Sequence, residues 1–182
     1  MESVESNFTV TGGVRFETIV PEPELIIPNQ GSVNRVEFGI KITNQTSTPY
    51  RFMFFNLFPE LMGAYGGAME LYYGKKKTGG VKAPSAESYF LAKPGEAWIY
   101  KIKASLFYRG DQLALGGWDL SKVSWSFVGL RQAKYWIGFS YKNLFPAGKV
   151  NKGSTSWPFS EERWTGIASV PYREFYLKYP PS

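Results

Sequence analysis

Five residues between positions 108 and 119 are of the types that bind sugars: Tyr108, Arg109, Asp111, Trp118 and Asp119. A Trp or Tyr ring offers a large flat apolar area that stacks on the C–H face of a sugar ring. Carboxylate and guanidinium groups beside such a ring hydrogen-bond the sugar hydroxyls. The segment predicts a carbohydrate-binding site. The alternative is that Trp118 folds onto the end of the domain and buries its apolar area there.

Metal binding and enzymatic catalysis are not favoured by the residue types present. Asp111 and Asp119 are hard oxygen ligands, but their spacing does not form the Asp-x-Asp pattern of a cation site. The chain contains no His and no Cys. This composition excludes a Ser-His-Asp triad, a Cys-His dyad and the usual zinc sites. We therefore expect a binding protein rather than an enzyme, and no metal or cofactor.

The segment from residue 52 to residue 73, "FMFFNLFPELMGAYGGAMELYY", is apolar, rich in Met and interrupted by Gly. Met and aromatic residues on an adaptable segment suit a protein-binding surface. The segment also holds more apolar residues than one short strand buries. The alternative is that it packs across the domain as core. The residues expected to contact a protein partner are Phe54, Phe55, Leu57, Phe58, Leu61, Met62 and Tyr65.

A short basic cluster, Lys75, Lys76 and Lys77, follows Tyr72 and Tyr73. Aromatic rings next to Lys suit nucleic acid, whose bases stack and whose phosphates attract cations. Nucleic-acid surfaces usually draw basic residues from several segments, however. The net charge of +6 is spread over the chain. We therefore interpret the cluster as a solvated hairpin tip and do not expect a nucleic-acid partner.

The elements that position these candidates are predicted to be β-strands. Val36, Phe38, Ile40 and Ile42 alternate with polar residues or Gly, which is typical of a strand with one buried face. The turn "NQTSTP" follows, and a strand from residue 50 to residue 54 is expected to complete a hairpin. Later stretches show the same alternation, with the predicted inward faces Trp98, Tyr100, Ile102, Ala104 and Leu106; Trp125 and Phe127; Tyr135, Ile137, Phe139 and Tyr141; and Arg173, Phe175, Leu177 and Tyr179.

Turns and loops are predicted between these strands. "RGDQLALGGWDLSK" is expected to be a loop because of its Gly116-Gly117 pair, and short helical turns are expected at 59–62 and after Ser160. Lys93 to Glu96 form a Pro-Gly turn that serves folding. The sequence predicts an all-β protein, an antiparallel two-sheet immunoglobulin-like β-sandwich of about eight strands. We expect a single domain covering residues 1–182.

Four segments in order resemble a bacterial immunoglobulin-like β-sandwich: "VEFGIKITNQTSTPYRF", "LAKPGEAWIYKI", "WSFVGLRQAKYWIGFSYKN" and "WTGIASVPYREFYL". The resemblance covers roughly residues 34 to 179 and implies that Tyr135 is a tyrosine-corner residue. Asn44 and Pro94-Gly95 are similar to positions of the bacterial intracellular proteinase inhibitor (BsuPI-like) family. That family implies a cytosolic β-sandwich that inhibits a protease through exposed loops. The Trp-rich segment usual in that family is not evident here.

The beginning of the chain, "MESVESNFTV", is acidic and no apolar run follows it, which does not fit a secretory signal. No stretch approaches the roughly 20 apolar residues of a membrane-spanning helix. We therefore expect a cytoplasmic protein without a membrane span. Its partner is expected to be another protein, with a carbohydrate as the alternative ligand.

Overall fold

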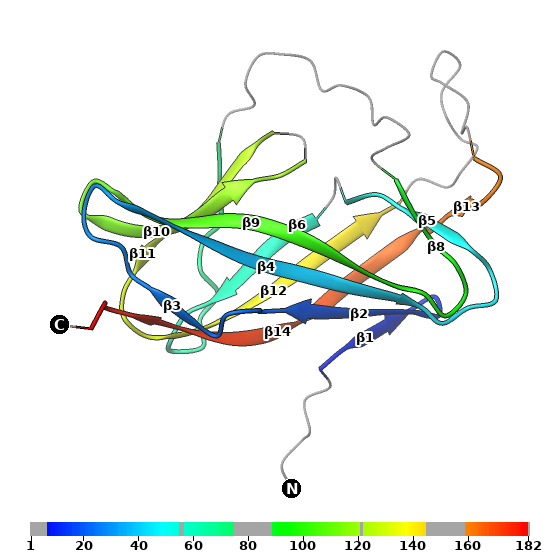
Figure 1. Cartoon of the computed structure of the whole chain (residues 1–182), viewed down its shortest axis with the longest axis horizontal. Helices are drawn as coiled ribbons and strands as arrows, with labels where there is room; N and C mark the ends of the chain where they lie inside the picture. Colours follow the sequence, from blue (N-terminus) through cyan, green and yellow to red (C-terminus); the bar gives the residue numbers. More distant parts are fainter. Residues whose placement is uncertain (1–6, 55–56, 75–88, 121, 145–158, 182) are drawn as a thin grey trace, which may run out of the picture.

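A computed structural model of the chain describes residues 7–54, 57–74, 89–120, 122–144 and 159–181. These residues form β-strands joined by turns and contain no α-helix (Figure 1). The strands make two larger sheets, with a small third sheet at one end. The prediction of an all-β, sandwich-like fold is confirmed.

The larger sheet has seven strands, and every pair of neighbours in it is antiparallel. Its centre is formed by the two long strands β4 and β9, which pair along residues 33–43 and 97–107. The order across the sheet is β1 (Thr9–Thr11), β2 (Val14–Ile19), β4 (Val33–Asn44), β9 (Ala97–Arg109), β10 (Gln112–Trp118), β11 (Ser124–Leu130) and β7 (Tyr72–Tyr73).

The second sheet has four strands, in the order β3 (Glu24–Ile26), β14 (Gly166–Lys178), β12 (Lys134–Asn143) and β6 (Leu57–Met62). Its edge strand β3 runs parallel to the end of β14, where residue 24 pairs with residue 176. The third sheet consists of β13 (Glu162–Arg163), β5 (Tyr50–Phe52) and β8 (Phe90–Ala92). Among the described residues, eight strands have six residues or more, and the other six strands have two or three.

Buried apolar residues from the sheets form one continuous core. The inward faces predicted from alternation are confirmed for three strands and in part for two others. In β9 the exceptions are Trp98, which is 45% exposed, and Tyr100, which is partly buried; of the four residues predicted to face inward in the last strand, only Phe175 and Leu177 are buried. The predicted inward residues that the structure buries include Val36, Phe38, Ile40, Ile42, Ile102, Ala104, Leu106, Trp125, Phe127, Tyr135, Ile137, Phe139 and Tyr141.

The predicted hairpin between residues 36–42 and 50–54 is wrong. β4 pairs with β2 and β9, whereas β5 pairs with β8 and β13 in the small sheet. The cause is Asn44, which is fully buried and holds the chain in a crossing turn. Its Nδ2 donates to the carbonyls of Thr48 and Ala92, both at 2.8 Å, and its Oδ1 accepts from the Thr46 N–H at 3.0 Å and from the Thr46 hydroxyl at 2.7 Å.

The Lys93–Glu96 turn packs against this same crossing turn and, through hydrogen bonds, links two strands of the larger sheet. The Glu96 N–H donates to the Lys93 carbonyl at 3.0 Å, and Gly95 takes a φ of 79° in the third position of the turn. Pro before such a Gly fits a type II turn. The Gly95 N–H donates to the Asn44 carbonyl at 2.7 Å, which ties the start of β9 to the end of β4.

Tyr135 lies at the point where the chain leaves the larger sheet at the end of β11 and enters the second sheet in β12. Its hydroxyl donates to the Arg131 carbonyl at 3.2 Å and accepts from the Arg131 N–H at 3.0 Å. The ring is buried and lies 5.8 Å from the ring of Phe175. These hydrogen bonds reach back four residues along the chain, which is the geometry of a tyrosine corner.

Residues 112–118, predicted to be a loop, form strand β10 instead. Gly116 and Gly117 are required there by close contacts rather than by an unusual backbone conformation. A Cβ on Gly116 would lie 2.6 Å from the Trp125 carbonyl oxygen, and a Cβ on Gly117 would lie 2.7 Å from the Lys103 carbonyl oxygen. The glycines therefore let β10 approach its neighbours closely, which is a known use of Gly in strands.

Replacing Gly117 with Ala is expected to lower the free energy of unfolding by about 2 kcal/mol, the usual cost of overpacking a well-packed site. The new methyl group would meet the Lys103 carbonyl oxygen and, at 2.9 Å, the Trp125 ring, and neither is the end of a flexible chain. Urea unfolding measures the difference. Gly67→Ala is the matched control, because no described atom lies within 4 Å of the added Cβ; an equal loss in the two variants would contradict the explanation.

Two predicted helical turns are also strands. Residues 57–62 form β6, an edge strand of the second sheet, and residues 162–163 after Ser160 form β13. β6 places Leu57, Pro59 and Leu61 on its buried side. Pro59 lacks an N–H, which suits an edge strand and weakens its capacity to pair with another chain.

Candidate functional site

The described residues form a groove of about 890 Å³ on the larger sheet. This volume is within the range of about 300–1,000 Å³ found for ligand pockets. β4, β9, β10, β11 and β7 all contribute side chains to it. The pairing of β9 with β10 ends at Ala104 and Gly117, and beyond this point the β10–β11 hairpin turns away from β9 (Figure 1). The sheet therefore bends around the groove.

Small residues form the floor of the groove. Gly116 of β10 pairs with Ser105 of β9 on one side and with Ser126 of β11 on the other. All three line the groove, so its floor crosses three adjacent strands without a large side chain at these positions. The groove therefore owes its depth to the glycine that packing already requires at position 116.

Larger side chains stand along the two sides. Val33, Arg35 and Glu37 come from alternate positions of β4 and therefore share the outer face of the sheet. On the other side are Trp118, at the end of β10, and Tyr72 of β7. Trp118 is 59% exposed and Tyr72 is 45% exposed, so a large part of each side chain faces solvent. The Tyr72 hydroxyl donates to Glu70 at 2.7 Å, and this hydrogen bond raises the pKa of Tyr72.

The position of Trp118 is set by the tight turn that follows it. The Asp119 N–H donates to the Val123 carbonyl at 3.0 Å, and the Val123 N–H donates back to the Asp119 carboxylate at 2.8 Å. Burial raises the pKa of Tyr73 and of Tyr100 to about 12, with a smaller contribution from the negative charge of Asp119. Asp119 therefore serves the turn and lies near two phenol groups.

The five residues predicted to bind sugar divide between two ends of the same strand. Trp118 and Arg109 both line the groove. They lie roughly 20 Å apart along the sheet, because Arg109 pairs with Gln112 and β10 rises about 3.4 Å per residue from there to Trp118. Tyr108 packs against the core, and Asp111 lies in the β9–β10 turn. Asp111 and Asp119 are thus separated by the whole of β10, which excludes a shared cation site.

The predicted protein-binding surface is wrong for three of its residues, because Phe54, Leu57 and Leu61 are buried in the core. The physical reason is the alternation of β6, which turns Leu57 and Leu61 inward, while the Phe54 ring stacks on Tyr100 at 4.3 Å. Phe58 and Met62 are partly buried, and Tyr65 is 88% exposed. Phe55 and the basic cluster Lys75, Lys76 and Lys77 lie outside the described residues.

The groove is also lined by three charged residues that were not predicted from the sequence: Arg35, Glu37 and Lys103. Arg35 pairs with Ser105, and Glu37 pairs with Lys103, so the four residues stand together on the outer face. The sequence pattern shows only that these residues point outward from their strands. Solvent-exposed residues of any sheet have the same pattern, so it does not identify a groove.

A second hollow of about 470 Å³ lies between the sheets, next to the Trp118 end of β10. Its lining is mostly apolar and includes Leu57 and Pro59 of β6 and Tyr100 and Ile102 of β9. Lys103, Trp118 and Trp125 contribute to both hollows. Trp118 therefore stands at the boundary between the open groove and the apolar interior.

No three Asp or Glu residues in the described part of the chain come close enough together to hold a metal ion. In the same residues, no helix has the length and apolar character needed to cross a membrane. Comparison with protein-family models, with curated proteins and with solved structures found no significant match.

Proposed function

We propose that this protein is a binding domain rather than an enzyme, and that it holds a carbohydrate chain in the groove of the larger sheet. The observation that carries the proposal is the groove itself, roughly 20 Å long with an exposed Trp118 at one end. An extended ligand fits an open trough of this length better than a compact one does. The burial of Phe54, Leu57 and Leu61 favours the groove over the segment first expected to bind a protein.

The chemistry of the lining supports a carbohydrate. Trp118 and Tyr72 offer rings on which sugar rings stack. Ser105, Ser124 and Ser126 carry hydroxyls that donate and accept hydrogen bonds, and Glu37 accepts them from sugar hydroxyls. A few polar groups placed along a partly apolar surface are typical of ligand sites.

Replacing Trp118 with Ala is expected to weaken binding of a polysaccharide by about 2 kcal/mol, or roughly thirtyfold, as for other aromatic anchors of a binding site. Affinity gel electrophoresis against a panel of neutral and acidic polysaccharides measures the change. The fold should be retained, because most of the Trp118 surface is exposed and such substitutions usually cost within about 0.5 kcal/mol.

Tyr179→Ala is the matched control for this experiment. Tyr179 is 58% exposed, nearly the same as Trp118, and it lies outside the groove. Its removal should leave polysaccharide mobility shifts unchanged. If the unmodified protein binds no member of the panel, or if the two variants lose affinity equally, the groove is not a carbohydrate site.

A further inference from the structure

We propose that the ligand of the groove is an acidic polysaccharide whose sugar units carry carboxylate groups. This inference rests on the proposed function and adds the charge of the ligand to it. Three cationic side chains line the groove: Arg35 of β4, and Lys103 and Arg109 of β9. All three are exposed. A cation beside a groove attracts anionic ligands and forms strong hydrogen bonds with carboxylates.

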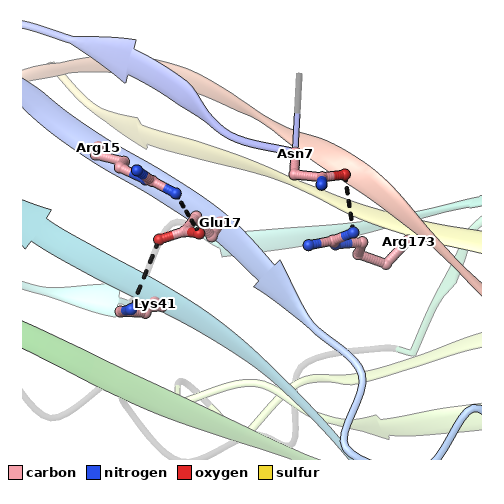
Figure 2. A network of polar contacts seen from close by, with 5 residues as sticks. All are labelled: Asn7, Arg15, Glu17, Lys41 and Arg173. Atoms are coloured by element: carbon pink, nitrogen blue, oxygen red, sulfur yellow. Dashed lines mark hydrogen bonds and ion pairs between the residues drawn. The ribbon is translucent and has the colours of Figure 1, made fainter. Parts of the chain in front are cut away.

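These three cations have no ion pair with any carboxylate in the described part of the chain. On the outer face of the same sheet, but farther from the groove, the cations do form ion pairs with a carboxylate. There the Glu17 carboxylate lies between Arg15, at 2.8 Å, and Lys41, at 3.9 Å (Figure 2). Intramolecular carboxylates thus neutralise the cations of β2 and of that end of β4, while the cations of the groove remain available to a ligand.

The carboxylates in the groove do not cancel this charge. Glu22 and Glu37 line the groove with the three cations. The Glu37 carboxylate also forms an ion pair at 3.0 Å with Lys101, which is outside the lining. Lys101 therefore offsets Glu37, and the groove keeps an excess of positive charge.

The cations are spaced along the length of the groove rather than gathered at one point. Lys103, Ser105 and Arg109 lie on the same face of β9, and Arg35 stands beside Ser105 in register. The three charges are thus about 7 Å and about 14 Å apart along the strand direction, at 3.4 Å per residue. Spaced charges suit a polymer with a carboxylate on its repeating units better than a small anion, which would use one cation.

The same lining favours a polysaccharide over a nucleic acid. A nucleic-acid strand carries a phosphate on every nucleotide for the cations, but its backbone offers few hydroxyl donors to the carboxylates of Glu22 and Glu37. Sugar hydroxyls instead donate hydrogen bonds to these carboxylates. A uronate polymer has both groups that the lining requires, namely carboxylates for the cations and hydroxyls for the acidic and serine side chains.

Binding of matched polymers by isothermal titration tests the inference. The probes are polygalacturonate and alginate, each compared with a methyl-esterified form that has the same sugars without the charge. The acidic forms should bind at least about tenfold more tightly than the esters, which corresponds to one hydrogen bond to a charged group. Their affinity should fall between about 0.05 M and about 0.5 M NaCl, because salt screens exposed charges.

Substitutions of the groove cations test whether they are responsible for the preference for the acidic polymer. Arg35→Gln and Lys103→Ala should each weaken binding of the acidic form about tenfold and leave binding of the ester within about twofold. Lys142→Ala removes an exposed cation from β12 of the second sheet and should change neither affinity. Thermal unfolding of each variant separates loss of a contact from loss of the fold.

The outcomes distinguish this inference from the function on which it rests. Equal affinity for acid and ester, with both lost in Trp118→Ala, would overturn the inference and leave carbohydrate binding intact. No binding to any acidic or neutral polysaccharide would overturn both. Tighter binding of a single-stranded oligonucleotide than of any uronate polymer would also overturn the inference, in favour of a nucleic-acid ligand.

Discussion

The Trp164→Ala variant is expected to lose about 4 kcal/mol of unfolding free energy, the cost found for truncating large aromatic residues in cores. Trp164 is only 2% exposed. Its ring stacks on Tyr141 at 5.4 Å and on Phe52 at 5.8 Å, and it lies 5.2 Å from the Phe16 ring. These three rings come from β12, β5 and β2, so Trp164 joins all three sheets. Its removal would leave a cavity that no single strand can close.

Urea unfolding followed by circular dichroism measures this loss, and Trp118→Ala is the matched control. Both variants truncate the same side chain, but Trp118 is 59% exposed. We expect the control to change the unfolding free energy by less than about 0.5 kcal/mol. Similar losses in the two variants would show that burial does not decide the effect, contrary to the structure.

The second large effect is expected for Asn44→Ala, which should lower the unfolding free energy by about 3 kcal/mol, because buried polar groups left unpaired cost about 1–3 kcal/mol each. Asn44 is fully buried. The substitution removes the donor to the carbonyls of Thr48 and Ala92 and the acceptor for the Thr46 N–H. The buried Ala92 carbonyl would lose this partner without access to water.

Asn34→Ala provides the comparison for this variant. Asn34 also donates from its side-chain amide to a carbonyl, that of Ile26, at 2.8 Å, but this hydrogen bond is exposed. Water replaces the lost donor there, so we expect a loss of less than about 1 kcal/mol. Chemical denaturation of the two variants under the same conditions gives the difference directly. A loss at Asn34 as large as that at Asn44 would refute the role assigned to the crossing turn.

The sequence was sufficient to predict the buried face of strands such as β4, but not which strands pair. Val36 to Ile42 alternate in a pattern that depends only on the local period of the backbone. Strand pairing depends on contacts between distant segments. The turn at Asn44 looks like a hairpin turn in sequence, yet its side chain bonds to the carbonyl of Ala92, 48 positions away.

Gly116 and Gly117 are a second case in which the local sequence did not predict the structure, for a different reason. Two adjacent glycines indicate a loop when only local conformation is considered. In the structure they are strand residues that pair with β9 and β11, and glycine is needed there because the Trp125 carbonyl and the Lys103 carbonyl leave no room for a Cβ. The need for a glycine at these positions is created by neighbours that the local sequence does not name.

In the candidate site, the aromatic residue Trp118 could be predicted from the sequence, but the charged residues Arg35 and Lys103 could not. Trp118 stands out in sequence as a Trp beside Asp in a Gly-rich segment, and the structure leaves it exposed in the groove. Arg35 and Lys103 have the pattern of ordinary outward strand residues. Their position in a groove results from the bending of the β10–β11 hairpin away from β9, which the local pattern does not encode.

The parallel pairing of β3 with the end of β14 has a consequence for biosynthesis. Residue 24 leaves the ribosome early, whereas its partner, residue 176, is among the last described positions to be made. The second sheet therefore cannot close until β14 has been synthesised and has left the ribosome. Until then, the nascent chain carries an unsatisfied β-edge and exposed apolar side chains, which is the condition in which chaperones bind and aggregation begins. We expect the second sheet to be the last of the two larger sheets to form during synthesis.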